Sequence, residues 1–314
     1  MHAITTGLPR RRRTGTAVAA LVAAAACWGL GTVVSKQVVD DVPPLTLLPV
    51  QLAASCLLLL ALAAARGELV TRGRSGLRLA ALGVLNPGVA YALGLIGLTT
   101  ITASMSVLLW ALEPVVILLL AALVLREHVS LALGSGVAVA VTGVLLVVYQ
   151  PGAAGATVGI TLTLVSVACC AVYTVLIRRS LLDDSSLRVV LAQHATALVF
   201  AGTLASVVAL FGGPGWDLAG LDRGDWAGAA LSGVLYYGLG FSLYLAGLRH
   251  VPASVAACFL PLIPVFGIVA GYSIGERLEP RQWLGAVVIV GAVAALVGLQ
   301  SERRSRPGLR GGDH

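Results

Sequence analysis

Two stretches of the chain, residues 83–101 and 233–251, are versions of one apolar motif that lie 150 positions apart. The first stretch begins GVLNPGVAYALGLIGL and the second begins GVLYYGLGFSLYLAGL. Glycines and leucines recur in register, in the pairs Gly83/Gly233, Gly88/Gly238, Leu93/Leu243 and Gly97/Gly247. A duplicated, apolar, helix-forming segment restricts the chain to an architecture of two similar helical halves.

The composition indicates that these halves lie in a membrane. Hydrophobic residues make up 58% of the chain and charged residues 11%, against about 25% charged residues in a soluble domain. Apolar stretches of about 20 residues can cross a hydrocarbon core of about 30 Å as helices. The arginine-rich start resembles a secretory signal, but the apolar stretch after it continues to Val34, so we interpret it as the first membrane helix. We therefore predict an all-α, polytopic membrane protein.

Ten apolar segments predict ten transmembrane helices, and the mostly short loops require antiparallel neighbours. The predicted helices are 17–36, 45–65, 78–98, 102–124, 130–149, 158–178, 187–211, 227–248, 251–274 and 282–300. The corresponding division of the chain is a basic tail (1–16), a first five-helix repeat (17–149), a second five-helix repeat (158–300) and a C-terminal tail (301–314).

The distribution of basic residues predicts the orientation of the chain. If the N-terminus is inside, 17 of the 21 Lys and Arg residues fall on cytoplasmic segments, and only Lys36, Arg223, Arg277 and Arg281 lie outside. Such an imbalance predicts that both termini are cytoplasmic in the inner or plasma membrane of the cell. The net charge of +7 therefore marks orientation, and we expect no nucleic-acid partner.

The repeat extends beyond the first motif. Gln51 matches Gln193 at an offset of 142, and Pro114 matches Pro264 at an offset of 150. The remaining matches are Thr32–Lys36 with Thr174–Arg178, Ala103-Ser104 with Ala253-Ser254, and Glu127 with Glu276 after a one-residue slip. Because five helices per half is an odd number, the halves enter the membrane from opposite sides as an inverted repeat. Such a pair provides the two arrangements that alternating access requires, so the repeat predicts transport.

Short motifs in both halves resemble a known family. The first half contains Cys27-Trp28-Gly29, Ala111-Leu112-Glu113-Pro114 and Leu125-Arg126-Glu127, and the second contains Leu260-Pro261-Leu262-Ile263-Pro264 and Gly275-Glu276-Arg277-Leu278. In this order and spacing they resemble the EamA family of the drug/metabolite transporter superfamily over about residues 17–300. The resemblance implies ten helices in two EamA-type domains and movement of small metabolites, often outward. Members include amino-acid exporters, drug exporters and other metabolite carriers.

The chain departs from this family at two positions. Gln51 stands near the place where the second helix of many relatives has a basic residue. Ile263 in the second half takes the place that Glu113 has in the first. Roles assigned to the cation in relatives therefore do not transfer to this chain.

Glu113 is the candidate for proton or substrate binding, because it is the acid at mid-span. Placing an acid there costs on the order of 2.5–3.5 kcal/mol, so such groups usually face a cavity or a partner. A low-dielectric surrounding favours the neutral carboxyl, which suits proton exchange. The alternative is that Glu113 hydrogen-bonds to backbone freed by Pro114 and only stiffens the kink.

Prolines interrupt the helices within the membrane, namely Pro87, Pro114, Pro261 and Pro264. Each removes an amide donor and frees a carbonyl group, which can line a cavity. Breaks at matching positions of two halves indicate a binding or gating site. Static bends that help helices pack are the alternative.

Polar and aromatic side chains on the same helices are candidates for lining the site. They are Trp28, Gln51, Asn86, Tyr91, Trp110, Tyr173, Gln193, His194, Tyr237 and Tyr244. Amides and phenols could orient a zwitterion or an amphipathic ligand, although Trp and Tyr are also common at membrane interfaces. His194 could titrate near neutral pH, or it could be a packing residue.

The motifs of enzymes and metal sites are not found in suitable contexts. All five cysteines lie in apolar spans and indicate neither disulfides nor metal ligands. We expect no enzyme activity, no cofactor and no metal.

The predicted function is a secondary transporter for an amino-acid-like or amphipathic, drug-like metabolite, with export favoured and proton coupling as an option. The expected partners are the substrate and membrane lipid, in a monomer or homodimer. The alternatives are an uncoupled facilitator, an importer, a lipid translocator, and a non-transporting membrane sensor or assembly protein.

Overall fold

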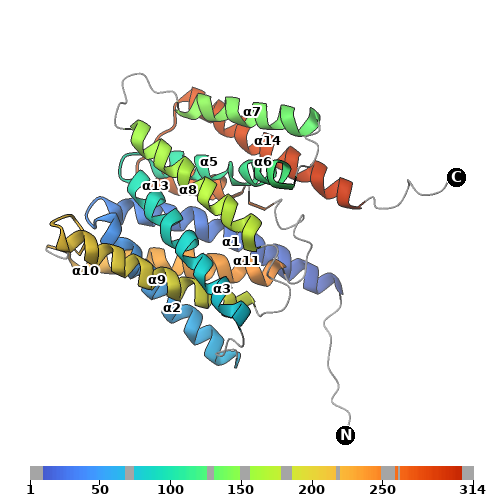
Figure 1. Ribbon diagram of the computed structural model, residues 1–314. Helices are drawn as coiled ribbons and strands as arrows, with labels where there is room; N and C mark the ends of the chain where they lie inside the picture. The colour runs from blue at the N-terminus through green and yellow to red at the C-terminus, as the bar shows by residue number, and fades with distance from the viewer. Residues whose placement is uncertain are drawn as a thin grey trace, which may run out of the picture.

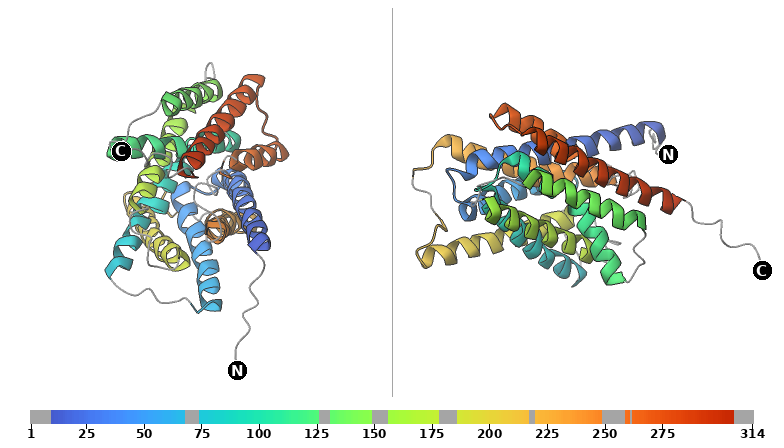
Figure 2. Two further views of the ribbon diagram at one scale, coloured as in Figure 1. Left: turned by 90° about the vertical axis from the view of Figure 1, so that its right-hand side faces the viewer. Right: turned by 90° about the horizontal axis from the view of Figure 1, so that it is seen from above.

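The molecule is a bundle of helices (Figure 1). The computed structural model describes residues 10–67, 74–125, 131–148, 156–177, 186–216, 220–248, 259–260 and 262–305. Helices and the turns between them make up this described part, and it contains no strand. The first residue of the first helix and the last residue of the last helix lie at the same end of the bundle (Figures 1 and 2), as an even number of membrane crossings requires.

The helices follow the predicted segments closely. The first half consists of α1 (Arg10–Val39), α2 (Pro44–Ala65), α3 (Arg74–Gly83), η1 (Val84–Val89), α4 (Ala90–Leu98), α5 (Ala103–Trp110), α6 (Glu113–Leu125) and α7 (Leu131–Val148). The second half consists of α8 (Ala156–Ile177), α9 (Ser186–Leu210), α10 (Arg223–Ser232), η2 (Gly233–Gly240), α11 (Phe241–Leu248), α13 (Leu262–Ser273) and α14 (Pro280–Ser305). The segments η1 and η2 are π-helical turns inside longer helices.

Five helices are long and apolar enough to cross a membrane. They are Gly15–Val39, Pro44–Ala65, Leu77–Leu98, Ala156–Thr174 and Leu187–Leu210. The other predicted spans are present as shorter or broken apolar helices. The segment 102–124, which the sequence predicts as one helix, consists of α5 and α6 with a break at Ala111 and Leu112. Of the predicted span 251–274, the structure describes residues 259–260 and 262–273.

The packing of the helices has the symmetry of an inverted repeat. The helix pairs α2/α9 and α7/α14 each join a helix to its own counterpart in the other half (Figures 1 and 2). Other contacts come in matching pairs: α1 packs against α13 as α8 packs against α6, and η1 packs against α9 as η2 packs against α2. The prediction of an all-α membrane protein built from two inverted five-helix repeats is confirmed.

Matching glycines and glutamines join the halves at two equivalent points. Gly83 contacts the backbone of Gln193 so closely that a Cβ atom there would collide with its carbonyl oxygen. Gly233 contacts the backbone of Gln51 in the same way. The two glutamines are a pair of the sequence repeat, and so are the two glycines. Equivalent residues of the two halves therefore make the same contact twice.

The side chains of the two glutamines are also hydrogen-bonded across helices. Gln193 Nε2 donates to the carbonyl oxygen of Leu79 (3.0 Å), and its Oε1 accepts from the hydroxyl of Tyr173 (2.8 Å). Gln51 Nε2 donates to the hydroxyl oxygens of Ser35 (3.0 Å) and Ser232 (2.8 Å). These bonds hold three helices together around each glutamine.

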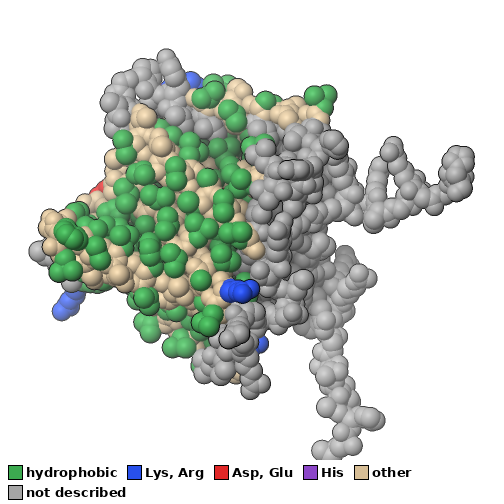
Figure 3. Space-filling view, in the orientation of Figure 1, with side chains coloured by type: hydrophobic (Ala, Val, Ile, Leu, Met, Phe, Trp, Pro, Cys, Tyr) green, Lys and Arg blue, Asp and Glu red, His purple; other side chains and the backbone are tan. Residues whose placement is uncertain are grey.

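The outer surface is apolar, as expected of a surface in contact with lipid. Leu57, Val199 and Val287 on α2, α9 and α14 are 69%, 70% and 67% exposed. Hydrophobic side chains cover the described face of the bundle in Figure 3, where Lys, Arg, Asp and Glu side chains are few. A soluble protein rarely exposes a contiguous apolar area of this kind.

The close contact at Gly83 leads to a test of the packing. We expect Gly83→Ala to destabilise the protein by about 1–3 kcal/mol, because a methyl group there overpacks the contact with Gln193. Gly291→Ala on α14 is the matched control, because a Cβ at Gly291 meets nothing within 4 Å. Thermal unfolding of the detergent-purified proteins measures the difference. Equal melting temperatures for Gly83→Ala and the wild type would contradict the packing described here.

Candidate substrate site

The helix breaks are the first component of the site. Leu112 N donates to the carbonyl oxygen of Leu109 and Val116 N to that of Leu112, at 3.1 and 3.0 Å. Between them, Pro114 has no amide hydrogen, so the carbonyl group of Trp110 lacks its usual helical donor. The chain consequently leaves α5 and starts α6 with Glu113, an acid at a helix N-terminus, where the helix dipole favours negative charge.

Breaks occur in three other helices as well. Asn86 has non-helical backbone angles (φ −142°, ψ 117°) next to Pro87 in η1, and η2 is the corresponding π-helical turn of the second half. Pro264 lies in the first turn of α13, as Pro114 lies in the first turn of α6. Pro261 lies outside the described residues. Irregular backbone at membrane depth is tolerated where protein covers it or where it lines a cavity. We therefore expect the substrate site to lie near these breaks.

A small cavity lies among these broken helices. Its volume is about 30 Å³, which accommodates water but no organic ligand. Of the candidates predicted from sequence, Tyr91, Trp110 and Tyr237 line it. The other lining residues are Thr32, Ser35, Gly94, Leu95, Leu98, Ser106 and Tyr236. In this conformation the cavity is smaller than a metabolite.

Aromatic rings form the wall of the cavity. Trp110 and Tyr91 are stacked, with ring centroids 5.4 Å apart and an angle of 14° between the ring planes. Tyr91 also meets Tyr236 and Tyr237 edge to face, at 5.4 and 5.1 Å. These separations are typical of favourable aromatic pairs, so the four rings support one another in a fixed arrangement.

The rings continue past the cavity to the first helix. His194 lies between Tyr237 (6.1 Å) and Phe241 (5.4 Å). Trp28 lies between Phe241 (5.5 Å) and Tyr244 (5.4 Å). We call the whole series the aromatic row; it consists of Trp110, Tyr91, Tyr236, Tyr237, His194, Phe241, Trp28 and Tyr244. The row connects helices of both halves through the interior of the bundle.

Glu113 lies beside this row. Its side chain is half-buried, and its carboxylate is within electrostatic range of the phenol groups of Tyr91, Tyr236 and Tyr244. The ion pairs of the described part join Lys36 to Asp40 and Arg281 to Glu279, so within these residues Glu113 has no cationic partner. Glu113 is thus an acid whose charge acts on the phenol groups of these rings.

Several buried polar atoms near the row have no hydrogen-bond partner among the described residues. They are Nε1 of Trp28, Oδ1 of Asn86 and Nδ1 of His194, together with Oε1 of Gln51. Buried polar groups are usually paired, so these atoms are groups that a ligand could satisfy. The amide nitrogen of Gln51 and both polar atoms of the Gln193 side chain, by contrast, are used in the bonds between helices.

Tyr236 and Phe241 belong to the row but were not among the lining residues predicted from the sequence. Both could have been found from the repeat, because Phe241 is the counterpart of Tyr91 and Tyr236 that of Asn86 at the offset of 150. Among the described residues, no group of three or more His, Cys, Asp or Glu side chains could hold a metal ion.

Comparison with known proteins identifies the class of this molecule. The profile of the EamA-like transporter family matches residues 15–149 and again residues 157–298. The chain belongs to the EamA-like transporter family. It is therefore a multi-pass membrane transporter with one family unit in each half.

One protein with a transporter name is similar in sequence, and one solved structure is similar in fold. The chain is 25% identical over 223 residues to the uncharacterized transporter YyaM of Bacillus subtilis (strain 168), covering 69% of this chain and 72% of that protein. A crystal structure described only as that of a protein has the same fold, with a TM-score of 0.65 and 17% identity over 92% of this chain and 99% of the other.

The different surroundings of Gln51 and Glu113 in this transporter predict different effects on stability. Gln51→Leu removes the bonds to Ser35 and Ser232, and we expect a loss of about 1–2 kcal/mol. Glu113→Gln removes no hydrogen bond seen in the described part, so we expect its melting temperature to match the wild type. Thermal unfolding in detergent measures both. Destabilisation by Glu113→Gln equal to that by Gln51→Leu would assign Glu113 to structural support of the kink.

Proposed function

We propose that this transporter moves a small metabolite that is amino-acid-like or amphipathic and has a protonated amine. We further propose that it works by alternating access, outward, in exchange for protons. The observation that supports this most is the position of Glu113, at the start of a broken helix and beside the aromatic row. The proposed function contains no catalytic step and no cofactor.

The aromatic row suits a ligand that is both apolar and cationic. Ring faces attract cations by about 0.5–2 kcal/mol, more when water is excluded. Trp110 and Tyr91 provide stacked faces, and the hydroxyl groups of Thr32, Ser35 and Ser106 provide hydrogen bonds on the cavity wall. A carboxylate at Glu113 would complement the charge of an ammonium group at the same place.

Exchange of substrate for protons follows if the carboxyl group of Glu113 binds either a proton or the ammonium group of the substrate, but not both at once. Glu113 would hold a proton when the site is empty of substrate and release it when an ammonium group binds. An ionisable group inside the membrane is expensive and commonly belongs to a transport pathway. Because binding of the two cations would be mutually exclusive, an inward proton gradient would drive the substrate outward.

The inverted halves supply the conformational change in this proposal. The symmetric pairs α2/α9 and α7/α14 would remain packed while the broken helices rock against them, as in other inverted-repeat transporters. We propose that both termini face the cytoplasm and that the protein lies in the cell membrane, as a monomer or homodimer surrounded by lipid.

A second candidate function is supported by the position of Glu113 in the first turn of α6. There the helix dipole stabilises a carboxylate, and the residue could stay charged throughout the cycle. The protein would then be an uncoupled facilitator, and the imposed proton gradient would have no effect on transport.

Transport assays in inside-out vesicles distinguish these functions. We expect labelled amphipathic amines or amino acids to accumulate when an imposed pH gradient is present. Glu113→Gln should reduce this uptake by roughly tenfold or more, because it removes the group that exchanges the two cations. Glu279→Gln is the matched control, since it removes an equal charge from an exposed loop residue.

The outcomes separate the proposals cleanly. Uptake that is equal with and without the gradient, and equal in Glu113→Gln, would support the facilitator and contradict proton coupling. No uptake of any compound by folded wild-type protein would contradict transport of this class of metabolite.

The orientation can be tested with single cysteines in a background without native cysteines. Phe211→Cys and Ala65→Cys both replace exposed residues without changing charge. In intact cells, a membrane-impermeant thiol reagent should label Phe211→Cys but label Ala65→Cys only after the membrane is opened. The reverse pattern would show that the positively charged loops face outward.

A further inference from the structure

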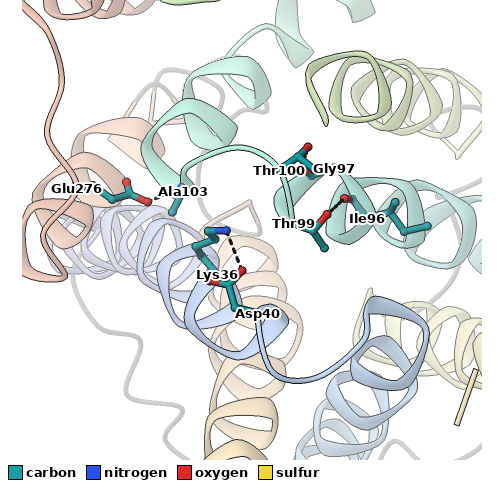
Figure 4. A network of polar contacts seen from close by, with 8 residues as sticks. All are labelled: Lys36, Asp40, Ile96, Gly97, Thr99, Thr100, Ala103 and Glu276. Atoms are coloured by element: carbon teal, nitrogen blue, oxygen red, sulfur yellow. Dashed lines mark hydrogen bonds and ion pairs between the residues drawn. The ribbon is translucent and has the colours of Figure 1, made fainter. Parts of the chain in front are cut away.

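A carboxylate joins the two halves of the protein at one end of the bundle (Figure 4). Glu276, in the turn after α13, accepts three hydrogen bonds from the start of α5. The donors are Ala103 N (2.7 Å), Ser104 N (2.9 Å) and Ser104 Oγ (2.6 Å). We call this contact the latch, and the end of the bundle where it lies the Glu276 end.

The latch completes the hydrogen bonding of a helix terminus. The first amides of any helix have no partner within the helix. In α5, the N-cap Thr102 accepts from Met105 N, while the amides of Ala103 and Ser104 bond to Glu276 from the other half. A carboxylate is also favoured there by the helix dipole. Separation of α5 from Glu276 would therefore leave two amide donors and one charge without these partners.

Glu276 is held firmly to α13. Its own amide donates to the carbonyl oxygen of Gly271 (3.0 Å). The guanidinium of the neighbouring Arg277 lies 4.9 Å from the ring centroid of Tyr272 and donates to the Tyr272 carbonyl oxygen. Gly275 provides the left-handed backbone conformation (φ 92°) of the turn. The carboxylate consequently moves with α13. The latch can therefore form only while α5 and α13 are close together.

The cavity lies directly along α5 from the latch. Ser106 and Trp110, both on this eight-residue helix, line the cavity. Next to the latch, Ala103 packs in one apolar cluster with Ala270 of α13 and Val33 of α1. The latch and this cluster thus lie at the first turn of the helix whose later turns line the cavity.

We propose that Glu276 is a gating residue of the transport cycle. The latch holds the Glu276 end closed in the present conformation, and it breaks each time the site opens toward that end. This inference depends on the proposed alternating access, since a gate has a function only if the site opens to both sides. It assigns the gate to a carboxylate that touches no part of the aromatic row.

Glutamine cannot replace Glu276 in the latch. Its amide offers one acceptor oxygen, and its NH₂ group would face the amide donors of α5. The uncharged side chain also forms weaker hydrogen bonds than a carboxylate does. Glu276→Gln should therefore shift the conformational equilibrium toward the state that is open at the Glu276 end.

The accessibility of a buried reporter cysteine tests the gate. Ser106→Cys, in purified protein whose native cysteines are replaced, is treated with a charged methanethiosulfonate reagent that reacts only with thiols reached by water. We expect Glu276→Gln to raise the modification rate roughly tenfold. Glu279→Gln is the matched control in the same loop, because this exposed acid only pairs with Arg281 at 3.6 Å, and it should leave the rate unchanged.

A second reporter separates gating from general loosening. Ala197→Cys is fully buried in the apolar cluster that includes α2 and α9, away from the latch, and its rate should not change in Glu276→Gln. An unchanged rate at Ser106→Cys in folded Glu276→Gln protein would overturn the proposal. An equal acceleration at Ala197→Cys would overturn it as well, because the latch would then be a general stabiliser.

The same variants distinguish an error in the proposed gate from an error in the proposed function. Faster labelling of Ser106→Cys without transport of any compound by the wild type would support the gate and count against the proposed substrate. Coupled transport by the wild type, together with unchanged labelling in Glu276→Gln, would support the function and reject the gate.

Discussion

The requirement that every backbone polar group be paired inside the protein determines the rest of this structure. No water is available in the hydrocarbon core, so helices in contact with lipid have to be continuous. Helices such as α8 and α9 are regular along their whole length and present apolar side chains outward. The breaks at Asn86 and at Ala111 and Leu112, and the π-helical turn η2, lie in helices that line the cavity. The proposed ligand site therefore coincides with the irregular backbone.

The two halves share a backbone arrangement but differ in the chemistry they bring to the site. The packing of Gly83 on Gln193 and of Gly233 on Gln51 is nearly the same in both halves. At the positions that form the aromatic row, however, Asn86 and Gly94 of the first half correspond to Tyr236 and Tyr244 of the second. Glu113 corresponds to Ile263. In the proposed transport cycle, symmetry would supply the two conformations, and asymmetry would supply one charged group to the proposed ligand site.

The spans and the pairing of the halves could be predicted from the sequence, because hydrophobic length and repeated glycines report directly on membrane crossing and close helix contact. An interruption of 102–124 at Pro114 was predicted, but its form, two separate helices α5 and α6, was not, since a proline can either bend a helix or begin a new one. The roles of individual side chains were harder to predict than the spans, because they depend on how far each helix is rotated about its axis. Gln51 and Gln193 were predicted to line the site, and in the structure their side chains form hydrogen bonds between helices. Glu276 was visible in the sequence as a repeat of Glu127 and as part of the motif Gly275-Glu276-Arg277-Leu278, but nothing in the sequence indicated its contact with α5. Glu127, Ala253 and Ser254 lie outside the described residues.

In the proposed mechanism, the substrate binds against the aromatic row, next to Glu113. The most direct test is an experimental structure of the protein with a transported compound bound. We predict ligand density in contact with Tyr91 and Trp110, with the charged group of the ligand toward Glu113 and with the cavity enlarged from its present volume of about 30 Å³. Density on the lipid-facing surface, with the stacked rings of Tyr91 and Trp110 unchanged, would contradict this mechanism.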